Sequence, residues 1–195
     1  GKTLLMLILV GGVALAWRSS LRLAPHERQP VLLFGFATAL VSIAYLSSVS
    51  FMPVSVAAVV FYTFPILIVL AEPLLTPAPF RADRFTVALI AFLGVALVVG
   101  PDLHGLDPRG LALAFLASLS ATAQFFAAAR CAQVPTLPKL FWSHIVILPV
   151  ALAILFVTGG LLPPQAFLLA PVAIAITYGG YIVGFLCQLL ALSRI

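Results

Sequence analysis

The sequence predicts an all-α, polytopic membrane protein, and three observations support this: its composition, its long apolar runs, and the confinement of charge to the connections between the runs. Of 195 residues, 64% are hydrophobic and 8% are charged, whereas a typical soluble domain is about 25% charged. Ten basic and five acidic residues are too few to give an apolar core a polar surface. The composition therefore excludes a soluble globular protein.

Apolar runs divide the chain into seven expected transmembrane helices. A bilayer core of about 30 Å requires about 20 apolar residues per helix. The runs occupy residues 4–17, 31–50, 53–75, 85–99, 110–129, 140–158 and 167–192. The first and fourth are short. A transmembrane β-barrel would need apolar residues at every second position, and residues 58–70 lack that alternation, so helices remain.

The first run follows Lys2 as a signal peptide would, but it ends at Trp17 and Arg18 without a small-residue cleavage site, so we expect a helix of the mature protein. The second run places Thr38, Ser42 and Tyr45 on one helical face.

The later runs also carry polar side chains at helical spacing. In the third, Tyr62 and Pro65 share a face, and in the fifth Ser120 and Gln124 do. The last run aligns Thr177, Tyr181, Gly184 and Gln188 on one face. Polar groups in lipid usually face the protein interior or a water-filled path. We predict a substrate cavity lined by Ser42, Tyr45, Tyr62, Pro65, Ser120, Gln124, Tyr181 and Gln188. The alternative is that the hydroxyls bond their own helices or join neighbouring ones.

Basic residues predict the orientation, because cytoplasmic loops collect Lys and Arg. Alternating spans place the following residues on one side: Arg18, Arg22, Arg28, Arg81, Arg84, Arg130, Lys139 and Arg194. Lys2 and Arg109 fall on the other side. We expect the first side to be cytoplasmic and the membrane to be the plasma membrane, specifically a bacterial inner membrane.

A weak internal repeat appears when the sequence is shifted by 141 residues, which aligns residues 4–17 with 145–158 and residues 31–50 with 172–191. The unit would contain five spans, an odd number, so the two copies would lie in opposite orientations, as in many secondary transporters.

Residues 44–100 resemble the EamA-like domain of the drug/metabolite transporter superfamily. The matching features are a short turn before Pro53, Pro65 in the next helix, Glu72 at the cytoplasmic end of that helix, and Gly94 in the following span. Val87 departs from the pattern, since the family often has glycine there. The resemblance implies ten helices in a 5+5 inverted repeat, of which this chain would hold helices two to eight. Residues 1–100 would form the first repeat without its first helix, and residues 101–195 the second without its last two.

Other residues give less specific signals. Glu72 is read as a helix-end residue, with an ion-pair gate to Arg81 or Arg84 as the alternative. Trp142 and His144 are expected to anchor their span at the interface, with gating or proton transfer by His144 as the alternative.

Cys131 and Cys187 are expected to be small buried hydrophobes, because neither lies at metal-ligand or redox spacing. No ligand cluster or catalytic constellation is present, so we expect neither a metal nor a cofactor, nor any catalytic residue.

The inverted repeat and the mid-span polar groups predict a secondary transporter that works by alternating access. The resemblance implies export, with uptake as the alternative, of small neutral, zwitterionic or amphipathic metabolites such as amino acids. No charged residue lies in the middle of a span, which disfavours a strongly charged substrate. The alternatives are a non-transporting scaffold or receptor and an intramembrane enzyme. The expected partners are a small-molecule substrate and the lipid bilayer, without nucleic acid, and a homodimer is left open.

Overall fold

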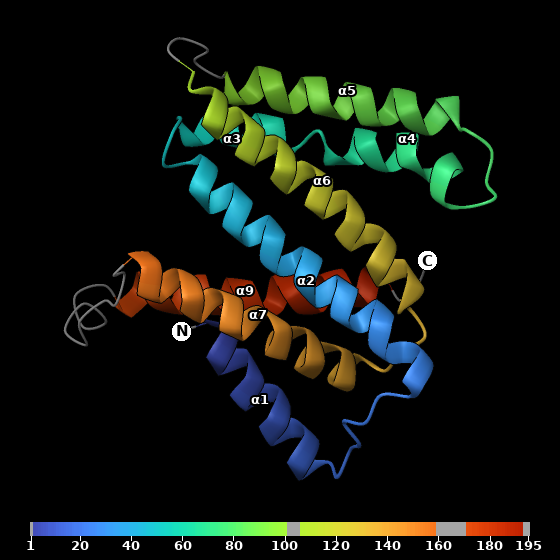
Figure 1. The fold of residues 1–195 in the computed structure, drawn as a ribbon, viewed down its shortest axis with the longest axis vertical. Helices are drawn as coiled ribbons and strands as arrows, with labels where there is room; N and C mark the ends of the chain where they lie inside the picture. The colour runs from blue at the N-terminus through green and yellow to red at the C-terminus, as the bar shows by residue number, and fades with distance from the viewer. Residues whose placement is uncertain (1, 101–105, 159–170, 193–195) are drawn as a thin grey trace. The chain divides into compact units, whose positions relative to one another are not determined.

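The structure, a computed structural model, describes residues 2–100, 106–158 and 171–192, with the side chains of 157–158 and 188–192 outside the description. The described part of the chain is helical and contains no strand (Figure 1). Its helices are α1 (Lys2–Ala16), α2 (Pro25–Ser48), α3 (Val54–Phe61), α4 (Phe64–Leu75), α5 (Ala82–Val99), α6 (Pro108–Arg130), α7 (Thr136–Thr158) and α9 (Pro171–Leu192). The all-α prediction is confirmed.

Five described segments are long and apolar enough to cross a membrane. They are Pro25–Ser48, Val54–Leu75, Ala82–Val99, Pro108–Arg130 and Thr136–Phe156. The apolar segments Lys2–Ala16 and Pro171–Cys187 are shorter. Helix α5 buries none of its side chains, and Leu97 and Val98 are 83% and 89% exposed. Such an apolar surface is stable in lipid rather than in water, so the chain belongs to the membrane proteins; seven spans remain a prediction.

Helix α2 begins earlier than the sequence predicted. The Glu27 carboxylate accepts a hydrogen bond of 2.8 Å from the Ala24 N–H, and the Glu27 N–H donates to the Ala24 carbonyl at 3.0 Å. This reciprocal pair resembles a capping box, and Pro25 suits the first helical position because it needs no N–H there. The polar stretch before residue 31, expected to be a connection, therefore supplies the first turns of the helix.

The chain divides into two compact units. The terminal unit contains residues 1–39 and 126–195, and the central unit contains residues 40–125. In the terminal unit α1 packs on α7 and α9 (Figure 1). The buried α1 residues Met6, Val10 and Ala14 follow helical spacing, which accounts for this contact.

A tight helix crossing joins α2 and α7 within the terminal unit. A Cβ added to Gly35 would lie 3.0 Å from both the Cα and the carbonyl oxygen of Ser143. Only glycine allows the backbones to approach this closely. Next to it, the buried Phe34 ring meets the Phe185 ring edge-on at 6.1 Å.

In the central unit, α5 lies alongside both α3 and α4 (Figure 1). The core of this unit contains Met52, Val56, Ala57 and Ala114. Helix α5 ends at Gly100, whose φ of 55° is the left-handed conformation that favours glycine at a helix end.

Candidate functional site

Residues 53–75 were predicted to form one helix, but the helix is broken at Tyr62 and Thr63. The Thr63 N–H turns to the Val60 carbonyl at 3.2 Å, and the Ile66 and Leu67 N–H groups both donate to the Thr63 carbonyl, at 3.0 and 3.1 Å. Pro65 has no N–H to donate to the Phe61 carbonyl, so the helix ends and a new one starts from Thr63. Tyr62 and Pro65, expected on one face of a single helix, therefore belong to different elements: Tyr62 caps the end of α3 and Pro65 lies in the first turn of α4.

This break leaves backbone polar groups without their usual helical partners. Pro65 cannot supply the N–H that the Phe61 carbonyl would receive in a continuous helix. The Ile66 N–H, which would reach the Tyr62 carbonyl, donates to the Thr63 carbonyl instead. The break lies near the middle of a 22-residue apolar segment. Unpaired backbone groups in lipid are costly, so the break must face protein, water or a ligand.

Hydroxyl groups hold the break in place. The Thr63 hydroxyl donates to the Val60 carbonyl at 2.7 Å, and its oxygen lies 2.8 Å from the Ser118 hydroxyl. Because the one Thr63 proton is committed to Val60, Ser118 is the donor of the second bond. One turn further along α6, the buried Thr122 hydroxyl donates to the Ser118 carbonyl at 3.0 Å.

Aromatic rings surround the same point. The Phe61 ring lies 5.3 Å from the Tyr45 ring and 5.3 Å from the Phe64 ring, and 5.8 Å from the Tyr62 ring, measured between centroids. Tyr62 is 44% exposed. Polar backbone groups beside aromatic faces suit a small amphipathic ligand.

A hollow of about 470 Å³ lies between α4 and α5, starting at Pro65 next to the break. It extends to Arg84 and includes Val87. The Arg84 guanidinium donates to the Glu72 carboxylate at 3.0 Å, so the partner of Glu72 is Arg84.

Arg81 instead pairs with Asp83 of the next helix start, at 2.6 Å. The hydrogen bond to this carboxylate raises the pKa of Arg81, so the guanidinium stays charged.

In the terminal unit, His144 is fully buried rather than at the interface as predicted. Its Nδ1 lies 2.8 Å from the Leu140 carbonyl, and its Nε2 lies 2.9 Å from the Tyr181 hydroxyl. The reason is that α7 begins at Thr136, which places His144 more than two turns inside the helix. Trp142 is half-buried and donates to the Leu21 carbonyl at 2.8 Å.

The structure brings three of the predicted cavity residues, Tyr45, Tyr62 and Pro65, to the break or next to it. Ser120 is buried and donates to its own Leu116 carbonyl at 2.7 Å, which matches the alternative reading of its role. Ser42 is exposed and has a bonding partner.

Three further predicted residues lie elsewhere. Gln124 is half-buried in the central unit and has a bonding partner. Tyr181 belongs to the terminal unit, and the side chain of Gln188 lies outside the described residues. Thr177, on the same predicted face, donates to its own Ala173 carbonyl at 2.8 Å.

Thr63 was not among the residues predicted from the sequence. The predicted face of α6 was also wrong, because Ser118 and Thr122 bond to residues at the break and Ser120 does not. The available signal was a threonine two residues before a mid-span proline, because such a hydroxyl can replace a missing backbone bond.

The two cysteines differ. Cys131 is fully buried, as predicted, whereas Cys187 is exposed, so the prediction for Cys187 was wrong. Burial raises the pKa of the Cys131 thiol, with a smaller opposing effect from the charge of Lys139. Within the described ranges, no three His, Cys, Asp or Glu residues gather as metal ligands.

Comparisons with known proteins give a fold likeness only. No family model matches the chain. No curated protein is significantly similar to it. A solved protein crystal structure superposes with a TM-score of 0.56 at 22% sequence identity, and the match covers 90% of this chain and 72% of the other. Identity at this level indicates a shared fold without indicating a shared activity.

Proposed function

We propose that the chain is a secondary transporter of the EamA-like drug/metabolite type that moves small neutral, zwitterionic or amphipathic metabolites by alternating access. The observation that carries the proposal is the break between α3 and α4, near the middle of a 22-residue apolar segment. Transporters commonly build substrate sites from such discontinuous helices. A scaffold or receptor would have no need to leave backbone groups unpaired at that depth.

The groups at the break favour an α-amino acid as the substrate class. The Tyr62 carbonyl, and the Phe61 carbonyl whose usual donor is replaced by Pro65, are acceptors suited to an ammonium group. Helix α4 begins at Phe64, and the positive end of its dipole there suits a carboxylate. The neighbouring rings suit an apolar or aromatic side chain.

The proposal includes the membrane arrangement implied by the sequence. Seven spans of a ten-helix inverted repeat would cross a bacterial inner membrane with the basic loops in the cytoplasm. Single cysteines placed at Arg22 and at Arg109, in a chain lacking Cys131 and Cys187, test the orientation. Arg22→Cys should react with an impermeant maleimide only from the cytoplasmic side, and Arg109→Cys only from the other side. Labelling of both from one side would refute the orientation.

Flux measurements test the transport proposal directly. The whole protein, including any segments beyond these 195 residues, is reconstituted in liposomes with tritiated phenylalanine or threonine. Saturable flux is expected, and Tyr62→Ala and Thr63→Val should each reduce it by about tenfold, the effect of one lost well-placed contact. Thr86→Val is the matched control, because Thr86 is exposed on α5 and bonds only its own Ala82 carbonyl. Absence of saturable flux with either probe would refute the proposed substrate class.

A further inference from the structure

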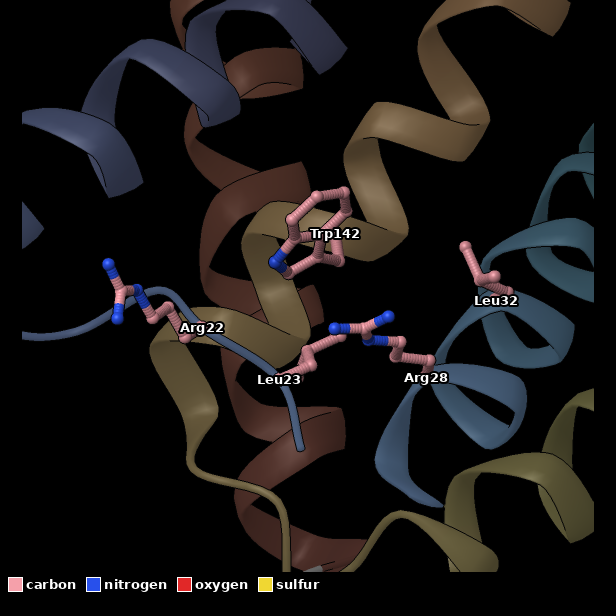
Figure 2. A pocket seen from close by; sticks show the side chains of 5 residues that line it. All are labelled: Arg22, Leu23, Arg28, Leu32 and Trp142. Atoms are coloured by element: carbon pink, nitrogen blue, oxygen red, sulfur yellow. The ribbon is translucent and has the colours of Figure 1, made fainter. Parts of the chain in front are cut away.

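A second hollow, in the terminal unit, joins basic and apolar side chains. It has a volume of about 550 Å³ and is lined by Arg22, Leu23, Arg28, Leu32 and Trp142. In Figure 2 the Arg28 guanidinium extends from α2 toward Leu23, below the indole ring of Trp142, and Arg22 lies on the segment that precedes α2.

The hollow is held in place by local bonds. The Trp142 indole N–H donates to the Leu21 carbonyl at 2.8 Å, which ties the segment carrying Arg22 to α7. Leu23 is buried, and the next residue, Ala24, takes part in the reciprocal bonds with Glu27 that start α2. Both walls of the hollow are therefore fixed without a ligand.

The two arginines of this hollow are not held by carboxylates. The ion pairs found within the described ranges involve Arg81 and Arg84, so neither Arg22 nor Arg28 is paired with a carboxylate there. The nearest carboxylate in the sequence, Glu27, bonds the Ala24 N–H. Figure 2 shows the Arg28 guanidinium beside the indole, whereas the Arg22 side chain extends away from it. The long Arg22 side chain can turn toward a phosphate held by Arg28, and each guanidinium offers several N–H donors in one plane.

An apolar groove continues from this hollow. A neighbouring depression of about 550 Å³ shares Arg28 and Leu32 with it and runs to Phe36 and Val146. Leu32 and Phe36 lie one and two turns beyond Arg28 on α2, so Phe36 is about 12 Å further along the helix axis at 1.5 Å per residue. With Arg28 at the level of the phosphates, Phe36 lies at the level of the acyl chains.

We propose that this site binds an anionic phospholipid, with its phosphate held by Arg22 and Arg28 and one acyl chain along Leu32 and Phe36. Basic pockets beside membrane helices favour anionic headgroups, and the groove explains why a lipid is expected rather than a free phosphate. The site shares no residue with the break between α3 and α4, and the inference does not depend on transport.

Tryptophan quenching tests the proposal. The chain has two tryptophans, and Trp17→Phe leaves Trp142, in the wall of the hollow, as the reporter. The protein is placed in phosphatidylcholine nanodiscs with a small fraction of phosphatidylglycerol brominated in the upper acyl chain, so that the surface carries little net charge. Brominated phosphatidylglycerol should quench Trp142 at a lower lipid fraction than brominated phosphatidylcholine does.

Two variants separate a built site from general attraction. Arg22→Gln with Arg28→Gln should weaken the preference for phosphatidylglycerol by about tenfold or more, because hydrogen bonds to a charged phosphate are lost. Arg18→Gln is the control: Arg18 is exposed and four residues before Arg22 in the chain but does not line the hollow, and its removal should change the preference by less than about twofold. Gel filtration and circular dichroism check that all variants remain folded.

Three outcomes would overturn the proposal. Equal quenching by the two brominated lipids would show no headgroup selection. An equal effect of Arg18→Gln would show attraction to surface charge alone. Displacement of the brominated lipid by soluble glycerol phosphate at comparable concentration would show a phosphate site that makes no use of the apolar groove.

Discussion

A proline near the middle interrupts the α3–α4 segment but not helix α7. Both carry a proline near the middle, Pro149 in one and Pro65 in the other, yet α7 continues from Thr136 to Thr158 while the other segment breaks. Four apolar residues precede Pro149, whereas Thr63 stands two residues before Pro65 and bonds both Val60 and Ser118. A proline removes one backbone bond in each segment, and the Thr63 hydroxyl bonds accompany the break in the one that is interrupted.

The tight crossing that supports α7 should give the largest effect. Gly35→Leu would push its side chain into the Ser143 backbone and lower the free energy of unfolding by about 3 kcal/mol, since the backbone there cannot move aside as a flexible side chain would. Thermal or denaturant unfolding in detergent measures this change. Gly94→Leu is the control, because a Cβ at Gly94 meets nothing within 4 Å. Equal destabilisation by both variants would mean that the crossing is not tight.

The two prolines can be compared directly by replacing each with alanine. Pro65→Ala restores an N–H for the Phe61 carbonyl, favours a continuous helix, and should reduce flux of tritiated phenylalanine by about tenfold. Pro149→Ala restores a bond inside a helix that is already continuous, so flux should stay within about twofold and stability should rise. A reduction of flux by Pro149→Ala as large as that by Pro65→Ala would refute a special role for the break.

This contrast shows how far the sequence could lead. The all-α class and the apolar segments follow from composition and run length, because lipid leaves the backbone few alternatives. The break did not follow, because a mid-span proline is compatible with both outcomes and the deciding contact, from Thr63 to Ser118, joins residues 55 positions apart.

The candidate residues show the same limit. Tyr45 and Tyr62 could be selected as polar groups in apolar runs, but the choice of Ser120 over Ser118 required the rotation of α6 against the break. His144 was misplaced because the first turn of α7 contains polar residues and was assigned to a loop. The spacing of residues shows which side chains share one face of a helix. It does not show which of those faces packs against a neighbouring helix.

The hydroxyl network should contribute about 1 kcal/mol of coupling. Thr63→Val leaves Ser118 without its acceptor, and Ser118→Ala leaves Thr63 with its Val60 bond intact, so the first variant should be the more destabilising. The double variant should cost less than the sum of the two, because both remove the same bond. Unfolding in detergent of the four proteins gives the coupling. Strict additivity would mean that the two hydroxyls do not interact.

Cys131 offers a check on packing in the terminal unit. Because burial raises the pKa of this thiol above its ordinary value, the reactive thiolate is scarce even at pH 8.5. With Cys187→Ser, N-ethylmaleimide should therefore modify Cys131 only after denaturation, as read by mass spectrometry. Labelling of the folded protein within minutes would contradict its burial.

The smallest effect is expected for the ion pair at the far end of the central hollow. Glu72 and Arg84 lie 3.0 Å apart, but their side chains are 24% and 50% exposed, so solvent screens the attraction and a double-mutant cycle should give less than about 1 kcal/mol. The more exposed pair, Arg81 with Asp83, is the matched control, and its coupling free energy should be smaller than that of Glu72 and Arg84. A coupling above about 2 kcal/mol for Glu72 and Arg84 would mean that the pair is desolvated, which is the condition for an ion-pair gate. In that case Glu72→Gln would change flux as well as stability, and the function of the hollow would depend on this end as much as on the break.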